Sequence, residues 1–164
     1  MSRAAEQLAS KIIPTGQVEG HSWVRPLVFT NGVFDVLHRG HVTYLAVARE
    51  LGAALLVGVN SDASVKMLGK GPGRPLNLDI DRMWVLAGLE SVRYIALFDE
   101  STPCELIKRC RPDIYVKGGD YDIEALEETR LVRSWGGQSL AIAFVTGYST
   151  TALVQRIRED GEVQ

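Results

Sequence analysis

Two of the three histidines in this 164-residue chain, His38 and His41, lie three positions apart, and Gly40 stands between them. On the first turn of a helix, this spacing places both imidazoles on one face. A helix N-terminus offers unpaired N–H groups and a partial positive charge, and both favour phosphate. The pair therefore predicts a catalytic site that stabilises negative charge on phosphoryl oxygens, where Gly40 lets a ligand approach the backbone.

Two other interpretations of the histidine pair stay open. Asp35, His38 and His41 could supply three ligands to a metal ion. The two imidazoles could instead cap and pack the helix without binding anything. We favour the phosphate interpretation because of the glycine and the helix start, and we expect no metal ion held by protein ligands alone.

A glycine-rich basic segment, residues 68–75, follows the second predicted strand and contains three glycines and two prolines. Lys70 and Arg74 project from it, and Lys66 stands just before it. Such a loop could close its cations over a polyphosphate and exclude water, although a merely solvated loop is the alternative. We predict a lid, with Lys70 (or Lys66) as its closing lysine. The sequence contains no P-loop motif, which excludes that phosphate site, and no G-x-G-x-x-G follows the first strand, which disfavours a conventional dinucleotide fold.

Hydroxyl and glycine residues mark two further segments. One hydroxyl would cap the last predicted helix, but residues 147–151 supply more, so we expect Tyr148, Ser149, Thr150 and Thr151 to bind a nucleotide's distal phosphates. In residues 117–120, the two glycines Gly118 and Gly119 leave bare backbone just before Asp120, where a flat base could lie, although a simple turn is the alternative.

Two more residues could bind a ligand or serve only the fold. Asn60 ends the second predicted strand, where the segment 60–62 could cap a helix or face the site. Arg82 begins a helix, where a cation opposes the helix dipole, which suggests that a ligand holds it there. Asp79 or Asp81 could neutralise it instead.

The elements that must position these residues alternate along the chain. Apolar runs predict strands at residues 27–30, 54–59, 92–97, 113–116 and 140–145, and helical patterns fall at 39–51, 79–89, 102–109, 123–135 and 150–158. Gly52 and Gly136 each follow a helix as a left-handed stop. The order predicts an α/β fold, a Rossmann-like three-layer α/β/α domain with a five-stranded parallel sheet over residues 27–164, after an N-terminal extension at 1–26.

This topology predicts where the chemistry lies, since ligands of open parallel sheets bind at the carboxyl ends of the strands. The first strand leads into Asn31, Gly32, Val33, Phe34 and Asp35. The segments at 60–62, 117–121 and 147–151 follow the second, fourth and fifth strands. All four therefore meet at one edge, where we expect a nucleotide.

The amino-acid composition of the chain excludes some classes of binding partner. Eighteen basic and twenty acidic residues give a net charge of −2, which excludes the broad cationic surface of a nucleic-acid or membrane binder. The sequence contains no apolar run near the ~20 residues of a membrane span and no signal-peptide pattern, so we expect a cytoplasmic protein. Cys104 and Cys110 fit neither a disulfide framework nor a zinc motif, and we expect them to pack as small apolar side chains.

The segment Thr30 to Asp35, followed by His38-Arg39-Gly40-His41, resembles the first signature of the cytidylyltransferase-like nucleotidylyltransferases, and residues 147–151 resemble their second. Together with residues 58–62, 73–75 and 116–121, the pattern is similar to the D-glycero-β-D-manno-heptose 1-phosphate adenylyltransferases over residues 27–158. This resemblance implies that ATP and heptose 1-phosphate give ADP-heptose and pyrophosphate for lipopolysaccharide core biosynthesis.

The resemblance also implies partners: a separate heptose kinase and phosphatase that supply the substrate, and a second copy of the chain in a homodimer. Two other functions stay open, a related enzyme such as a glycerol-3-phosphate cytidylyltransferase, and a non-catalytic nucleotide-sensing module. The related cytidylyltransferases carry an arginine shortly before the second signature, where this chain has Phe144-Val145-Thr146. That difference weakens the cytidylyltransferase alternative.

The expected mechanism is an in-line attack on the α-phosphorus of ATP. We expect His38 and His41 at the α- and β-phosphates, Lys70 and Arg74 over the triphosphate, and Mg²⁺ bridging phosphate oxygens. Asn31 and Asp35 are expected to face the sugar phosphate. The other nucleotide contacts are assigned to Gly32, Val33, Phe34, Gly40, Asn60, Lys66, Arg82, Gly118, Asp120, Tyr148, Ser149, Thr150 and Thr151.

Overall fold

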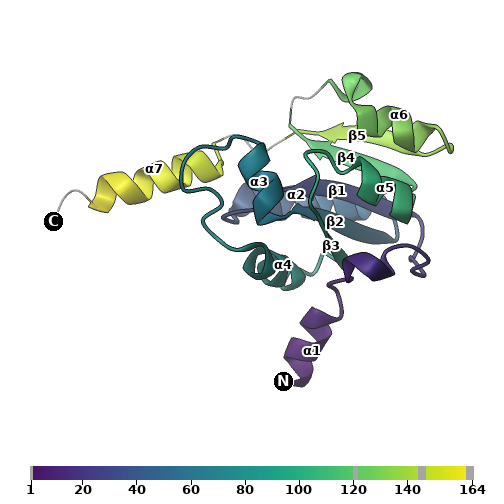
Figure 1. Ribbon diagram of the computed structural model, residues 1–164, viewed down its shortest axis with the longest axis horizontal. Coiled ribbons are helices and arrows are strands. Elements are labelled where there is room, and N and C mark those ends of the chain that lie inside the picture. Colours follow the sequence, from purple (N-terminus) through teal and green to yellow (C-terminus); the bar gives the residue numbers. More distant parts are fainter. Residues whose placement is uncertain (1, 120–121, 144–146, 162–164) are drawn as a thin grey trace.

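Five parallel strands form a single sheet in the order β3-β2-β1-β4-β5 (Figure 1). The structure is a computed structural model that describes residues 2–119, 122–143 and 147–161. The strands are β1 (Leu27–Gly32), β2 (Ala54–Asn60), β3 (Tyr94–Phe98), β4 (Ile114–Gly118) and β5 (Gln138–Ile142). Because β1 lies in the middle, the chain reverses its direction of winding there, and the loop after β1 lies at the switch point where such sheets bind ligands.

Helices cover both faces of the sheet. The α-helices are α1 (Arg3–Ala9), α2 (Arg39–Glu50), α3 (Asp62–Met67), α4 (Asp79–Ala87), α5 (Cys104–Cys110), α6 (Glu127–Arg133) and α7 (Thr150–Gly161), with short 3-10 turns η1 (Thr15–Gln17) and η2 (Ile123–Ala125). One core cluster joins the sheet to α5 and α6, and a second joins its other face to α2 and α4. The predicted three-layer fold is therefore confirmed.

Alternation along the strands explains the two clusters, since successive strand residues point to opposite faces. In β2, Ala54 and Leu56 pack on the α5 side, whereas Leu55 and Val57 pack on the α2 side. All seven residues of β2 are buried, as expected for a strand covered on both faces. Both cysteines are free and buried in α5, as the sequence predicted.

Several predicted element boundaries are wrong, among them those of two strands and one helix. The third strand begins at Tyr94 rather than at residue 92, and the last runs over Gln138–Ile142 rather than 140–145, of which residues 144 and 145 lie outside the described part. The single helix predicted at 123–135 is η2 followed by α6, because Leu126 is extended at ψ 137° and interrupts the helical backbone.

Helix α3 was not predicted. Its N-cap is Ser61, whose hydroxyl accepts a hydrogen bond from the Ser64 amide at 3.1 Å. This helix carries Lys66 on the outside of the molecule, and it ends at Met67, directly before the predicted lid segment at residues 68–75.

The two helix-stop glycines behave differently from each other. Gly136 has the expected positive φ of 86°. Gly52 does not, and the residue that ends α2, Leu51, is right-handed. Gly52 is required by close packing instead, because a Cβ there would lie 2.6 Å from the carbonyl oxygen of Pro26.

The segment before β1 packs on the domain. Ile12 forms a parallel bridge with Ile95 of β3, and Ile13 and Val18 are buried in the core cluster on the α5 side. Figure 1 shows α1 below α4, whereas α7 runs outward from the body at the opposite end of the chain. Within the described residues, the structure contains no helix of the length and apolarity that crossing a membrane requires.

Candidate active site

The two histidines of the first signature form a stacked pair at the start of α2. Their ring centroids are 3.8 Å apart at an interplanar angle of 20°. His38 is the N-cap residue, with an extended backbone, and its side chain makes no capping hydrogen bond. The Nδ1 atoms of both rings are buried without a hydrogen-bond partner among the described residues. The pair therefore has hydrogen-bonding capacity that the protein itself does not use.

Gly40 makes this stacking possible. A Cβ at position 40 would lie 3.0 Å from Nδ1 of His38 and 3.1 Å from the Cβ of Tyr148. On the other side of the pair, the ring of Phe34 contacts His41 edge-on, with centroids 5.3 Å apart. The motif therefore needs a glycine because the start of α7 packs directly against α2 there.

Both histidines are neutral near pH 7. Burial lowers the pKa of His38, and burial together with the neighbouring His38 lowers the pKa of His41 to about 4. Two imidazolium ions stacked this closely would repel each other. The pair is consequently a set of neutral hydrogen-bonding groups, not a fixed double positive charge.

Asp35 holds the lid segment to the loop after β1. Its Oδ1 accepts hydrogen bonds from the amides of Leu76 and Asn77 at 2.8 and 2.9 Å, and its Oδ2 pairs with Nη1 of Arg74 at 2.7 Å. Burial alone would raise the pKa of Asp35, but these donors outweigh it and hold that pKa below its usual value. The structure thus places Asp35 against Arg74 of the predicted lid segment and against the two residues that follow this segment, whereas the sequence predicts that Asp35 faces the sugar phosphate.

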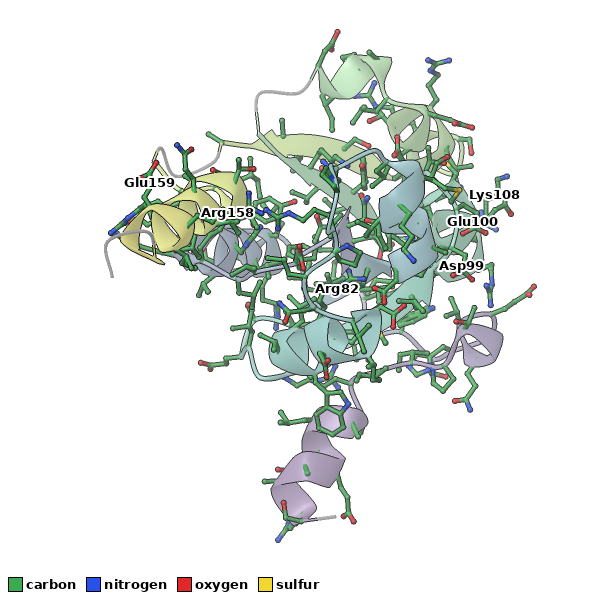
Figure 2. All side chains as sticks on the ribbon, turned by 60° about the vertical axis from the view of Figure 1, so that its left-hand side comes forward. Arg82, Asp99, Glu100, Lys108, Arg158 and Glu159 are labelled. Atoms are coloured by element: carbon green, nitrogen blue, oxygen red, sulfur yellow. The ribbon has the colours of Figure 1, made fainter. Side chains whose placement is uncertain are left out.

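Arg82 is a buried connector rather than an exposed cation. Its guanidinium donates to the Asn77 carbonyl, to the Val33 carbonyl and to Oδ1 of Asp62, at 3.1, 2.6 and 2.8 Å. It is 1% exposed, and Figure 2 shows it in the interior beside α4. Arg82 therefore ties together Asn77 after the predicted lid segment, the loop after β1 and the start of α3, and its acidic partner is Asp62 rather than Asp79 or Asp81.

A first cavity of about 280 Å³ opens at the carboxyl edge of the sheet. It lies mainly on the α5 and α6 side, and its polar lining includes Asn31, Asn60, Ser101, Lys117 and Glu128. Its remaining lining comes from Gly32, Val33, Phe34, His41, Tyr44, Leu68, Lys70, Pro103 and Gly118. Asn60 also donates from Nδ2 to the Ser64 hydroxyl at 2.9 Å, which fixes that amide at the cavity wall.

A second cavity, of about 340 Å³, lies on the side of α7. Its lining is Val33, Phe34, Asp35, His41, Val65, Lys70, Arg74, Thr150 and Thr151. Val33, Phe34, His41 and Lys70 line both cavities. The imidazole of His41 therefore stands where the two cavities meet.

The hydroxyl residues at and just before the start of α7 make different contacts. The Ser149 hydroxyl caps the helix by accepting from the Ala152 amide at 3.0 Å. Thr150 donates to the Val36 carbonyl at 3.3 Å and, with Thr151, lines the second cavity. The Tyr148 hydroxyl accepts from Arg39 at 3.3 Å, and its ring lies 6.4 Å from that of His38.

The structure separates the two candidate closing lysines. Lys70 lines both cavities, whereas Lys66 is exposed on α3 and lines neither. Gly118 lies at the first cavity, and Asp120 falls outside the described residues. The predicted residues that gather around His41 are thus Asn31 to Asp35, Asn60, Lys70, Arg74, Gly118, Thr150 and Thr151.

Most of the chain, including the residues that line the two cavities, matches one known protein family. Residues 29–156 match the cytidylyltransferase-like family. This chain belongs to that family.

Relatives of this cytidylyltransferase-like chain carry specific names. The D-beta-D-heptose 1-phosphate adenylyltransferase of Bordetella bronchiseptica is 60% identical over 135 residues, which cover 82% of this chain and 83% of that protein. The bifunctional protein HldE of Pseudomonas paraeruginosa is 51% identical over 135 residues, which cover 82% of this chain. The chain spans only 28% of the length of that HldE protein.

Solved structures agree on the fold of the cytidylyltransferase-like domain. The lipopolysaccharide core biosynthesis protein of Thermoplasma volcanium has a TM-score of 0.61 at 27% identity, covering 75% of this chain and 98% of that one. A pantoate-beta-alanine ligase from Francisella tularensis, at 12% identity and a TM-score of 0.55, covers 90% of this chain and 78% of that one and shares the fold alone.

Two charged residues at the first cavity were absent from the predicted site. Lys117 is the fourth residue of β4, and Glu128 is in the first turn of α6. A lysine directly after the apolar residues Ile114, Tyr115 and Val116 is unusual in a strand covered on both faces, and that signal could have identified it. Glu128 has no comparable signal, because it follows another glutamate at the start of a helix.

Proposed function

We propose that this protein transfers the AMP group of ATP to D-glycero-β-D-manno-heptose 1-phosphate, giving ADP-heptose and pyrophosphate for lipopolysaccharide core biosynthesis. The observation that carries the proposal is the stacked histidine pair, of which His41 stands at the junction of two cavities. A transfer between two substrates needs such a junction. The name of the Bordetella relative, at 60% identity, supports the choice of substrates.

The chemistry follows from the charges of the reactants. A phosphate monoester has a second pKa of about 6, so the acceptor is largely dianionic at pH 7 and needs no strong general base. An acceptor phosphate oxygen attacks the α-phosphorus, a new P–O bond forms, and the bond to the β-phosphate oxygen breaks. Both electrons of that bond leave with pyrophosphate. The protein has to align the groups and stabilise the charge that spreads over the phosphoryl oxygens.

Neutral histidines suit this task. With its pKa near 4, His41 carries one ring N–H at neutral pH and can donate it to an α-phosphate oxygen. His38, also neutral, can serve the neighbouring phosphate oxygen. A prearranged donor of this kind contributes most when the charge develops in the transition state.

The leaving pyrophosphate belongs in the second cavity. Thr150 and Thr151 lie there at the start of α7, a 12-residue helix whose N-terminus favours anions. Lys70 and Arg74 reach the same cavity from the lid. These groups can hold the β- and γ-phosphates while the α-phosphorus stays at the histidine pair.

Mg²⁺ fits this site as an ion that the triphosphate, rather than the protein, would coordinate. Across residues 2–119, 122–143 and 147–161 there is no group of three His, Cys, Asp or Glu side chains that could hold a metal ion. Asp35, the carboxylate of the second cavity, is already engaged by the lid. Magnesium would take its ligands from phosphate oxygens and water, as it does at many nucleotide sites, and would reduce the charge on the triphosphate.

The test is a matrix of nucleotides and acceptors. Purified protein is incubated with ATP or CTP and with heptose 1-phosphate or glycerol 3-phosphate, and released pyrophosphate is measured. We expect release with ATP and heptose 1-phosphate at a kcat/KM at least tenfold above every other pair. Release only with CTP and glycerol 3-phosphate would replace the proposal by the related cytidylyltransferase activity. Nucleotide binding without release for any pair would indicate a sensing module.

A further inference from the structure

The first cavity contains two opposite charges that the mechanism above does not use. Lys117 reaches it from β4, and Glu128 reaches it from α6. In the register of the sheet, Val28 and Phe29 of β1 pair with Ile114 and Tyr115, so Asn31 lies beside Lys117. The Nζ atom of Lys117 accordingly lies 3.5 Å from Oδ1 of Asn31.

In-line displacement assigns this cavity to the acceptor. The entering and leaving oxygens stand on opposite sides of the reacting phosphorus. With pyrophosphate held by Thr150, Thr151 and Arg74 in the second cavity, the entering oxygen has to approach from the other side of His41. The first cavity is the space on that side, and Lys70 and His41 line both spaces.

The charges of the first cavity match a phosphorylated polyol. Burial lowers the pKa of Lys117, while the nearby Glu128 opposes that shift and Lys70 adds to it. Lys70 and Lys117 are the cations that a phosphate dianion needs. Glu128 is 7% exposed, and an ionised carboxylate accepts hydrogen bonds but cannot donate them, which suits sugar hydroxyls.

We propose that Lys117 and Glu128 recognise the acceptor: the Lys117 ammonium pairs with the phosphate of a sugar 1-phosphate, and the Glu128 carboxylate accepts hydrogen bonds from its ring hydroxyls. This assignment rests on the proposed function and adds the residues that choose its acceptor. It makes Glu128 the residue that separates a sugar phosphate from a shorter phosphorylated alcohol, which has too few hydroxyls to reach it. Lys117 serves every phosphorylated acceptor alike.

Two neutral variants of similar size, Glu128→Gln and Lys117→Gln, test the proposal. Pyrophosphate release is measured with heptose 1-phosphate varied at saturating ATP, and again with glycerol 3-phosphate. The ATP dissociation constant is measured by titration calorimetry without an acceptor. Glu127→Gln and Lys108→Gln make the same charge changes at exposed positions of α6 and α5 and serve as controls; Figure 2 shows Lys108 at the outer side of the molecule.

We expect Glu128→Gln to raise the KM for heptose 1-phosphate at least tenfold, while its kcat/KM with glycerol 3-phosphate and its ATP dissociation constant stay within threefold of the parent. Lys117→Gln is expected to raise the KM for both acceptors at least tenfold, again with unchanged ATP binding. Unchanged ATP binding also shows that the variant is folded. If Glu128→Gln does not fold, the Lys117 variant decides the question.

Three outcomes would overturn the assignment. An acceptor KM within threefold of the parent in both variants would show that the cavity wall does not recognise the acceptor. An ATP dissociation constant that rises in parallel with the acceptor KM would assign Lys117 and Glu128 to the nucleotide. A parent protein that releases no pyrophosphate from ATP and heptose 1-phosphate would end the proposed function itself, and this inference with it.

Discussion

Replacing His41 by alanine is expected to lower kcat/KM by 100- to 1000-fold. The structure gives His41 one neutral ring N–H at the junction of the two cavities, because burial and His38 lower its pKa to about 4. The loss is therefore that of one prearranged hydrogen-bond donor, about 2.7–4 kcal/mol of transition-state stabilisation. It is not the loss of a full positive charge, so ATP binding should weaken by less than tenfold.

The assay for this variant is pyrophosphate release from ATP and heptose 1-phosphate, combined with calorimetry of ATP binding. His41→Asn keeps an amide N–H without a titrating ring and is expected to recover part of the rate. His21→Ala is the matched control, because His21 packs against Trp23, with ring centroids 4.3 Å apart, and lines neither of the two cavities. A kcat/KM within threefold of the parent for His41→Ala, or a loss found entirely in ATP binding, would refute the role of His41.

Three further predictions concern the same site. Lys70→Ala should lower kcat more than it weakens ATP binding, whereas Lys66→Ala should change kcat and ATP binding by less than threefold, because Lys66 lines neither cavity. Equal effects of the two variants in steady-state kinetics would contradict the assignment of Lys70 as the closing lysine. Gly40→Ala should cost about 1–3 kcal/mol of stability, measured by urea unfolding, and reduce activity, because its Cβ would lie 3.0 Å from His38. The pKa of His41 in the folded protein lies below its value near 6.5 in the unfolded chain. The contribution of His41 to the stability of the fold is therefore fully present above pH 6.5 and is lost as the pH falls towards about 4. An NMR titration that gives His41 a pKa above 6 would disprove this pH dependence.

The sequence was sufficient for the layers of the fold because its apolar runs and helical patterns alternate, which is typical of α/β domains with a parallel sheet. It also placed the histidine pair and the α7 hydroxyls at one edge, since the carboxyl ends of parallel strands meet there. Local interruptions were harder to foresee. The break at Leu126 depends on one extended residue, and α3 depends on a single cap at Ser61.

The partners of individual charges could not be predicted from the sequence. Asp35 pairs with Arg74, 39 positions away, and Arg82 with Asp62, 20 positions away. For both arginines the sequence contains nearer acidic residues, such as Asp79 and Asp81, that could have been the partner. Which aspartate each arginine contacts is determined only by the packing of the folded segments against one another. Glu128 belongs to the site for a similar reason, because α6 is turned so that this glutamate, and not exposed Glu127, lies at the cavity.

The Arg74–Asp35 pair has a consequence for turnover. In the proposed reaction, a triphosphate that binds Arg74 would have to displace the Asp35 carboxylate from it, so the binding of the nucleotide would gain only the difference between the two ion pairs. When the reaction ends, the Asp35 carboxylate can pair with the Arg74 guanidinium again and replace the departing pyrophosphate as its partner. An internal anion of this kind limits how tightly the product is held and thereby favours its release.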